Sequence, residues 1–207
     1  MTGAAVPRAE HVFKLLVTGP YAAGKTSLIG AVSHTPVVET DVETSGAEAD
    51  VKGRTTVAMD FGTYSLQDEA SNGDVRLLMF GTPGQPRFRF MTEIMKGSVD
   101  AVIFVVDTEA VETHAEAGAA MRALLADIRV PVVVAVNRCD HPATAAMLAR
   151  QLGALASEAA VPCQLIHTAS AREVVIEALL AVLDRLERCD VEVIDPLERV
   201  VALAGAA

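Results

Sequence analysis

The stretch that decides the fold is Gly19–Thr26, which reads GPYAAGKT and is preceded by the largely apolar run Val12–Val17. It has the form G-x-x-x-x-G-K-T, in which the backbone N–H groups of a tight loop converge on a phosphate chain. Such a loop needs glycine at Gly19 and Gly24. The helix expected to follow it would point the positive end of its dipole at the same anion. The stretch therefore predicts a strand, a loop and a helix that bind a nucleoside triphosphate.

Two side chains of this loop have predicted roles in chemistry. Lys25 is expected to reach the β- and γ-phosphates, and the hydroxyl of Thr26 is expected to ligate Mg²⁺, the implied cofactor. The predicted phosphate-binding set, with one glycine from a later motif, is Gly19, Tyr21, Ala22, Ala23, Gly24, Lys25, Thr26, Ser27 and Gly84.

Composition and charge limit the classes of partner. The formal net charge of −10 and the isoelectric point near 4.9 argue against a basic face for nucleic acid or for an anionic membrane surface. The three cysteines lie far apart and lack metal-ligand spacing, which fits a reducing compartment. No apolar run reaches the ~18–20 residues of a spanning helix, and signal-peptide and lipidation motifs are missing. We expect a cytoplasmic protein that binds no nucleic acid and has no intrinsic membrane anchor.

Apolar segments alternate with helical patterns along the rest of the chain. We expect strands at Thr56–Tyr64, Val75–Phe80, Ala101–Asp107, Val132–Asn137 and Cys163–Thr168. We expect helices to about Ser33 and over about 110–127, 144–159 and 172–188. This alternation indicates a parallel sheet covered on both faces. The strand near Thr56 should be an antiparallel edge strand, because a short turn joins it to the next, and the polar segment Thr35–Gly53 predicts a long mobile loop.

The stretch Asn137–Asp140, which reads NRCD, follows a buried strand and has the pattern N-x-x-D. One carboxylate, that of Asp140, can accept hydrogen bonds from both the N1–H and the 2-amino group of guanine, whereas adenine offers no such pair of donors. Asn137 is expected to tie this loop to the phosphate loop and to contact the base. A small residue at Ala169 would let its backbone N–H approach the guanine 6-oxo group. The predicted guanine-binding set is Asn137, Arg138, Asp140, Thr168, Ala169 and Ser170.

These motifs together resemble those of Ras-superfamily GTPases over roughly residues 11 to 188. The matching elements, in chain order, are Gly19–Thr26, Thr56, Thr82–Gln85, Asn137–Asp140 and Thr168–Ser170. The phosphate loop is similar to that of Arf-type members, and Thr55–Gly62 with Phe80–Gln85 resembles bacterial Mgl-like GTPases, especially those of actinobacterial conservons. The resemblance implies an α/β, three-layer P-loop NTPase fold. Its sheet would be mostly parallel and six-stranded, with one antiparallel edge strand and helices on both faces.

The resemblance also implies a domain organisation and partners. Residues 1–10 would form an N-terminal extension, 11–189 the GTPase domain and 190–207 a C-terminal tail. The tail is rich in apolar residues, so it is expected to pack on the domain or on a partner, a frayed terminus being the alternative. Mgl-like GTPases accompany roadblock-family proteins and histidine-kinase-like sensors. Such partners would recruit the protein to the membrane.

Roles in hydrolysis follow from the same resemblance. Gln85 would orient the attacking water, and Lys25 and Thr56 complete the predicted catalytic set. Thr56 would also ligate Mg²⁺ and sense the γ-phosphate, with Thr55 as the alternative. Arg54 either approaches the phosphates or is a solvated charge beside the loop.

The chain departs from the family pattern at three positions. Gly81 stands where the family has an aspartate that holds Mg²⁺ through water, Arg138 replaces a lysine, and Tyr21 replaces a glycine. Asp60 lies in an otherwise apolar strand and needs compensation there. We expect it to project into the space at Gly81 and to hold a Mg²⁺ water, the alternative being a salt bridge or backbone contact at the sheet edge. The predicted metal set is Thr26, Thr56 and, through water, Asp60.

Three functions compete for this chain. The first is a GTP-binding switch in bacterial signalling that hydrolyses GTP to GDP slowly until a partner accelerates it. Its loop Thr35–Thr56 and its segment Gly84–Lys96 would be ordered by Mg²⁺ and the γ-phosphate. The second is a nucleotide-bound adaptor with little hydrolysis, which the glycine at Gly81 favours. The third, a small-molecule kinase, is disfavoured because N-x-x-D and TPGQ are GTPase motifs.

Overall fold

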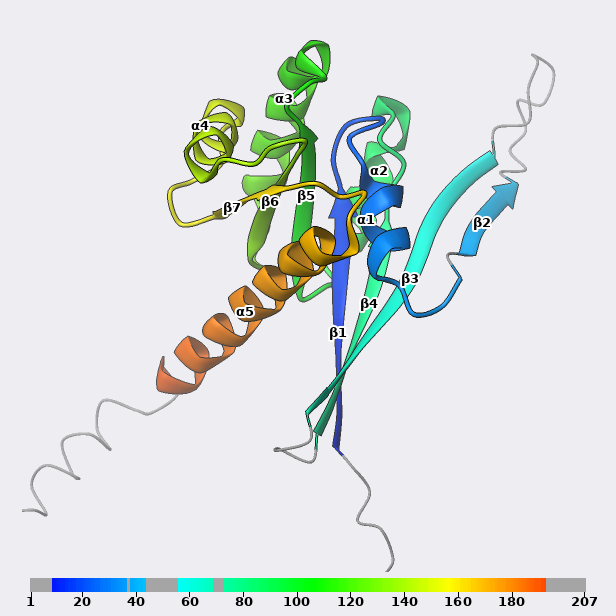
Figure 1. Cartoon of the computed structure of the whole chain (residues 1–207), viewed down its shortest axis with the longest axis vertical. Coiled ribbons are helices and arrows are strands. Elements are labelled where there is room, and N and C mark those ends of the chain that lie inside the picture. Colours follow the sequence, from blue (N-terminus) through cyan, green and yellow to red (C-terminus); the bar gives the residue numbers. More distant parts are fainter. Residues whose placement is uncertain (1–8, 37, 44–55, 69–72, 193–207) are drawn as a thin grey trace, which may run out of the picture.

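The computed structural model of the chain describes residues 9–36, 38–43, 56–68 and 73–192 (Figure 1). Its strands are β1 (Ala9–Thr18), β2 (Val38–Glu43), β3 (Thr56–Asp68), β4 (Gly73–Gly81), β5 (Ala101–Asp107), β6 (Val132–Asn137) and β7 (Ala159–Cys163). Its helices are α1 (Lys25–Val32), η1 (Pro86–Phe88), α2 (Arg89–Met95), η2 (Val111–Thr113), α3 (His114–Leu125), α4 (Pro142–Leu152) and α5 (Thr168–Glu192), where η marks a 3₁₀ turn.

Within the described residues, seven strands form one sheet in the order β2-β3-β4-β1-β5-β6-β7. The central strand β1 pairs in parallel with β4 and β5, and β6 and β7 continue the parallel part. Strand β3 runs antiparallel to β4, as the short connection between them predicts. The predicted three-layer α/β fold, with a mostly parallel sheet between helices, is confirmed, and the described residues give it seven strands in place of the predicted six.

The edge of the sheet differs from the sequence-based expectation. We predicted a loop over Thr35–Gly53, but the structure places β2 within it, paired antiparallel with β3 from Val38 opposite Phe61 to Glu43 opposite Thr56. Strand β3 is therefore covered on its outer side. The sequence of β2, VETDVE, is half acidic, and charged residues are typical of edge strands that resist further pairing. That polarity made the strand look like a loop.

The last third of the chain is shifted relative to the prediction. The helix expected over 144–159 is α4, which ends at Leu152 because Gly153 adopts a left-handed φ of 100°. Strand β7 then occupies Ala159–Cys163 instead of Cys163–Thr168, and α5 begins at Thr168 and continues to Glu192. The alanine-rich segment before Cys163 has high helix propensity, which concealed the strand.

Two hydrophobic cores lie on opposite faces of the sheet (Figure 1). Residues alternate along β1, so that Leu15 belongs to the core under α1 and α5, whereas Leu16 belongs to the core under α3 and α4. Strand β5 is buried along its whole length. This explains why its sequence is continuously apolar rather than alternating.

Helix α5 begins at the same edge of the sheet as the phosphate loop. Its buried face, which includes Val174, Val175 and Ala178, packs in the core with α1 and β1. Its outer face carries charged residues such as Asp184 and Arg188, which pair with each other. Across the described residues, no helix is both long enough and apolar enough to cross a bilayer. The predicted tail began at residue 190, but residues 190–192 continue α5. The rest of it, 193–207, lies outside the described part, so its packing stays a prediction.

The register of the sheet brings the carboxyl ends of four strands together. Val17 of β1 pairs with Gly81 of β4, and Thr18 pairs with Phe104 of β5. Asp107, the last residue of β5, pairs with Asn137, the last residue of β6. Ligands of parallel α/β sheets bind at this edge. The fold therefore gathers the predicted motifs on one side of the molecule.

Candidate functional site

The phosphate loop connects β1 to α1 and depends on its two motif glycines. Gly19 has a φ of 137°, and a Cβ there would lie 2.1 Å from the carbonyl oxygen of Val105. Gly24 has a φ of 111°, and a Cβ there would lie 2.7 Å from Nδ2 of Asn137. Both positions therefore require glycine for their backbone angle and for their close neighbours.

Lys25, the first residue of α1, is buried beneath the loop. Its Nζ donates hydrogen bonds to the carbonyl oxygens of Gly19, at 3.1 Å, and Pro20, at 2.6 Å. Burial lowers the pKa of Lys25 to about 8, against the opposing influence of the Asp60 carboxylate. A buried ammonium group is stabilised by an anionic partner. The position of Lys25 therefore suits a phosphate group bound over the loop.

Asp60 and Gly81 face each other in the β3–β4 pair. The Oδ2 atom of Asp60 accepts a hydrogen bond of 2.6 Å from the hydroxyl of Thr26. A Cβ on Gly81 would lie 2.9 Å from the Cβ of Asp60 and 2.8 Å from Cδ1 of Ile29. The lack of a side chain at Gly81 thus provides the space in which the Asp60 side chain lies.

The oxygen atoms of Thr26 and Asp60 fit a hard divalent cation. Mg²⁺ takes oxygen ligands, usually one or two carboxylates completed by water and phosphate oxygens. The described residues contain no group of three or more His, Cys, Asp and Glu side chains that would hold a metal by themselves. A bound phosphate chain would therefore supply part of the coordination. The side chain of Thr56, with Thr55 and Arg54, lies outside the part of the chain that the structure describes.

The segment after β4 lies directly against the phosphate loop. A Cβ on Gly84 would lie 2.5 Å from the backbone nitrogen of Tyr21 and 2.6 Å from Nζ of Lys25. The side-chain oxygen of Gln85 accepts a hydrogen bond of 2.9 Å from Nε of Arg87. Gly84 and Gln85 share one cleft of about 400 Å³ with the phosphate loop. The residues lining this cleft are Tyr21, Ala22, Gly24, Lys25, Thr26, Ser27, Asp60, Thr82, Pro83, Gly84 and Gln85.

Asn137, at the end of β6, joins two loops of the site. Its Nδ2 donates to the carbonyl oxygen of Ala23 at 3.1 Å, and its Oδ1 accepts from the backbone N–H of Leu165 at 3.1 Å. The side chain is buried, so both hydrogen bonds are shielded from water. The predicted tie between the N-x-x-D motif and the phosphate loop is confirmed, and a tie to the loop after β7 is added to it.

Arg138, which follows Asn137, has a left-handed φ of 55° and pairs with Asp107 at the end of β5. Asp107 is 1% exposed, so the guanidinium group supplies the charge that a buried carboxylate needs. Sequence reasoning gave Asp107 no role. The available signal was a carboxylate at the end of an otherwise apolar strand, beside the strand that carries the N-x-x-D motif.

The predicted base-binding residues fall on two elements. Asp140 is exposed in the loop after β6, whereas Thr168, Ala169 and Ser170 form the first turn of α5. The loop that directly follows β7 is instead 164–167, four residues earlier than expected, because β7 ends at Cys163. This loop meets Asp140 through Gln164, whose Nε2 donates to Oδ1 of Asp140 at 3.0 Å. Gln164 was missed because the strand was placed too late.

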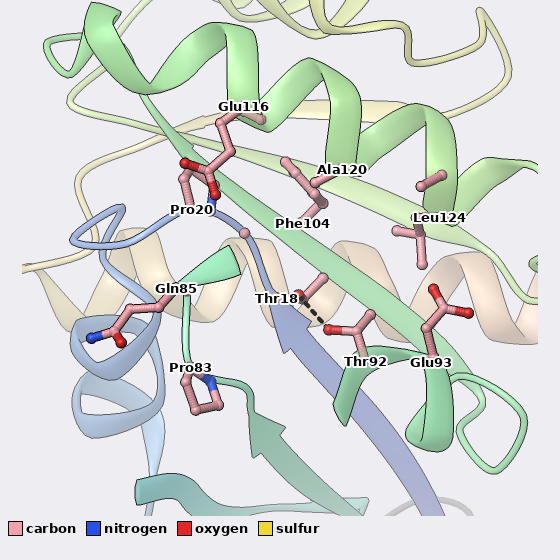
Figure 2. Close-up of a pocket in the computed structure, with 14 residues that line it drawn as sticks. Thr18, Pro20, Pro83, Gln85, Thr92, Glu93, Phe104, Glu116, Ala120 and Leu124 are labelled. Carbon is pink, nitrogen blue, oxygen red and sulfur yellow. Dashed lines mark hydrogen bonds between the residues drawn. The ribbon is translucent and has the colours of Figure 1, made fainter. Parts of the chain in front are cut away.

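A second cavity, of about 60 Å³, lies between α2 and α3 behind the phosphate loop (Figure 2). Phe104 of β5 and Ala120 of α3 line it, and Glu116 and Glu93 stand at its sides. Gly84 and Gln85 belong to this cavity as well as to the phosphate cleft. The segment after β4 therefore separates the two hollows.

Three threonine hydroxyls form a ring beside the second cavity, which two of the residues, Thr18 and Thr92, also line. The hydroxyl of Thr82 donates to that of Thr18 at 3.0 Å, and the hydroxyl of Thr92 donates to that of Thr82 at 3.4 Å. The hydroxyl oxygens of Thr18 and Thr92 are 3.2 Å apart and hydrogen-bonded (Figure 2). The three residues come from the segment after β4, from β1 and from α2. The ring therefore fastens α2 to the strands that carry the phosphate loop and Gly84.

Comparison with known families gives one match that covers most of the chain. The family model described as "conserved hypothetical ATP binding protein" matches residues 34–189. The match begins after the phosphate loop and includes the segment after β4 and the N-x-x-D motif.

Curated relatives are similar at low identity. The Ras-related protein Rab-11C of Dictyostelium discoideum is 31% identical over 96 residues, which cover 46% of this chain and 37% of that protein. The Ras-related protein RABA5e of Arabidopsis thaliana is 27% identical over 154 residues, covering 73% and 64%. The uncharacterized protein MJ1339 of Methanocaldococcus jannaschii is 29% identical over 128 residues, covering 61% and 70%. The chain thus spans less than two thirds of either Ras-related protein, and the similarity supports a P-loop protein of the small-GTPase kind.

Replacing Asn137 with alanine should lower the stability of the fold and also break the hydrogen bonds that join the two loops of the site. The change leaves the Ala23 carbonyl and the Leu165 N–H buried without a partner, and each such group costs about 1–3 kcal/mol. We expect the free energy of unfolding, measured by urea denaturation, to fall by about 2–6 kcal/mol. The control Gln151→Ala, at an exposed position of α4, should change it by less than about 0.5 kcal/mol. An equal effect of the two substitutions would contradict the role of Asn137.

Proposed function

The chain belongs to the family of conserved hypothetical ATP binding proteins, and we propose that within it this protein is a guanine-nucleotide-binding switch that hydrolyses GTP to GDP. The observation that carries the choice of base is the placement of Asn137 and Asp140 at the start and the end of one N-x-x-D motif after β6. The carboxylate of Asp140 is exposed beside a loop that Asn137 holds against the phosphate loop. A single carboxylate in that position matches the two adjacent donors of guanine, which adenine lacks.

The family description names ATP, so the base is the first point to test. The similarity to two Ras-related proteins favours GTP, and so does the N-x-x-D motif. Within the base-binding end, Thr168–Ser170 keep their predicted role as neighbours of the base. Arg138 would present its aliphatic stem to the ring while its guanidinium group stays paired with Asp107.

Phosphate binding and hydrolysis would be divided among residues that line the phosphate cleft. The loop N–H groups and Lys25 bind the phosphates, Gly84 offers its N–H to the terminal phosphate, and Gln85 orients water for attack. Thr26 and Asp60 would hold Mg²⁺, Asp60 through a water, and Thr56 would complete the set. When bound, this ion neutralises the charge that develops on the phosphate oxygens.

The switch would act through the segments on either side of the cleft. Gly84 contacts the phosphate loop and belongs to the segment that leads into α2, so loss of a terminal phosphate would change the contacts that position α2. Slow intrinsic hydrolysis, acceleration by a partner, and a place in bacterial signalling are part of this proposal. The proposal also places the protein in the Mgl-like branch, which the position of Asp60 opposite Gly81 supports through the resemblance. By the same resemblance, its partners would be a roadblock-family regulator and a sensor-kinase-like protein. Cytoplasmic location with recruitment to the membrane by these partners is also proposed.

An adaptor that binds nucleotide without hydrolysing it is the second candidate. Gly81 favours it, because the usual metal-orienting carboxylate is missing from that position. Asp60 weighs against it, because its carboxylate lies against Thr26 in the space that Gly81 leaves open. Turnover measurements separate the two candidates.

Replacing Asp140 with asparagine tests the choice of base. The change removes charge-assisted hydrogen bonds worth about 1.5–3 kcal/mol, so GTP affinity should fall by about one to two decades. Xanthosine triphosphate, which offers a complementary pattern, should bind the variant better than the unmodified protein. Titration calorimetry with GTP, ATP and xanthosine triphosphate measures this, with Asp184→Asn on α5 as the control. Equal competition by ATP and GTP for the unmodified protein would show that the assignment is wrong.

Replacing Gln85 with leucine tests hydrolysis. A residue that orients the attacking water is expected to contribute about 10²-fold or more to the rate, so turnover should fall by that factor while GTP affinity is nearly unchanged. Phosphate release under single-turnover conditions measures it, and Gln151→Leu on the exposed face of α4 is the matched control. Unchanged turnover would remove Gln85 from the mechanism. Absence of turnover in the unmodified protein, with or without partner, would favour the adaptor.

Replacing Asp60 with alanine tests the metal assignment. Loss of a residue that holds a metal-bound water typically costs about 10- to 100-fold in metal affinity or activity. We therefore expect the gain in GTP affinity on adding Mg²⁺ to shrink by about that factor, whereas Asp184→Ala should leave it unchanged. The affinities are measured by fluorescent-nucleotide titration with Mg²⁺ and with a chelator.

A paired substitution sharpens this test. Because Gly81 and Asp60 occupy one space, the double variant Asp60→Gly, Gly81→Asp moves the carboxylate to the other strand, where only the flexible end of the Ile29 side chain, 2.8 Å from the new Cβ, has to shift. It should recover the Mg²⁺ dependence that Asp60→Ala loses. If Asp60→Ala keeps the full Mg²⁺ dependence of GTP affinity, Asp60 has only a structural role in the sheet.

A further inference from the structure

The loop 164–167 lies beside the carboxylate to which the proposed function assigns the choice of base. Gln164 donates from its side-chain amide to Oδ1 of Asp140. Asp140 itself is exposed, and its loop touches the end of β7 through the backbone N–H of Cys139, which donates to the carbonyl of Cys163 at 3.3 Å. Two adjacent backbone segments therefore carry the carboxylate and the amide that holds it.

Gln164 is itself fixed on both sides of its backbone. Its N–H donates to the hydroxyl of Ser170 in the first turn of α5 at 2.9 Å, and its carbonyl accepts from the N–H of His167 at 2.8 Å. The next residue, Leu165, donates to Asn137. The loop therefore fixes the backbone from which the Gln164 amide reaches Asp140.

From this geometry we propose that Gln164 is a positioning residue that sets the preference for guanine by fixing the orientation of the Asp140 carboxylate. The proposal rests on the guanine-nucleotide function put forward above. A carboxylate has about four lone-pair sites, so one hydrogen bond from Gln164 leaves both oxygens able to accept from the base. An exposed aspartate held in one orientation loses less conformational entropy when it binds than a freely rotating one.

This role predicts a graded effect on different bases. Guanine presents both N1–H and a 2-amino group to Asp140, and hypoxanthine presents only N1–H. Both oxygens must be aligned for the guanine pair, so loss of Gln164 should weaken GTP binding more than inosine triphosphate binding. Tripolyphosphate, which has no base, should be unaffected.

The loop also carries a free donor for the same base. The backbone N–H groups of Gln164, Leu165 and His167 are used in the hydrogen bonds described above, whereas among the described residues that of Ile166 has no acceptor. The Ile166 side chain is 80% exposed, so this position is open at the surface. Ile166 is therefore a second candidate, beside Ala169 in the first turn of α5, to donate to the guanine 6-oxo group.

The variant Gln164→Met tests the proposal, because methionine keeps the length of the side chain and removes its donor. The affinities for GTP, inosine triphosphate, ATP and tripolyphosphate are measured by calorimetry on the full chain, with Gln151→Met on α4 as the control. We expect GTP affinity to fall about tenfold, inosine triphosphate affinity to fall less, and tripolyphosphate affinity to stay unchanged. Gln164→Glu, which places two carboxylates together, should weaken GTP further.

A double-mutant cycle separates positioning from other roles. In an Asp140→Asn background, Gln164→Met should have no further effect on GTP affinity. An effect that persists there would mean that Gln164 touches the base directly, and equal losses for all four ligands would mean a purely structural role; either overturns the proposal. A guanine-selective protein with unchanged affinities in Gln164→Met overturns this proposal alone. Equal affinities of the unmodified protein for GTP and ATP overturn the proposed function as well.

Discussion

The two hydrogen bonds of the buried Asn137 side chain are the interaction on which the site depends. They join the phosphate loop, the end of β6 and the loop after β7, which come from three distant parts of the sequence. An amide is suited to this position because it donates on one side and accepts on the other without a charge. These two hydrogen bonds also require glycine at Gly24, because a side chain there would displace the Asn137 amide. One residue type in the motif thus imposes another at a distant position in the sequence.

A second constraint operates between β3 and β4, where one space accommodates one side chain. In this chain Asp60 fills it, and the strand opposite carries glycine at Gly81. The neighbouring Ile29 of α1 closes the space from the helix side. A carboxylate beside Thr26 is thus available even though the position that usually provides it has no side chain. The departure from the family pattern at Gly81 and the unusual polar residue at Asp60 are two parts of one arrangement.

Sequence reasoning predicted the parts of the fold in which the pattern is strong. The bounds of β5 and β6 were correct because strands buried on both faces are continuously apolar. It failed at β2, because the acidic sequence of this edge strand is also typical of a loop. It failed at β7, because the alanines of this strand also favour a helix. The second error moved the predicted base loop by four residues and hid Gln164. The hydrogen bond from Asn137 to the phosphate loop was predictable from the N-x-x-D motif. The Gln164–Asp140 contact was not, because it depends on where β7 ends, and no residue pattern indicates that end.

Helix α2 is held at its middle and just after its last residue by interactions of different physical character. The ring of Thr18, Thr82 and Thr92 contains only hydroxyl groups, which do not ionise over the accessible pH range. Directly after the last residue of α2, Lys96 is paired with Asp127 and Glu93, and these hydrogen bonds raise the pKa of Lys96. Dissolved salt screens exposed ion pairs but leaves a shielded hydroxyl ring almost untouched. Rising ionic strength should therefore weaken the Lys96 contacts that follow α2 more than the threonine contacts at its middle.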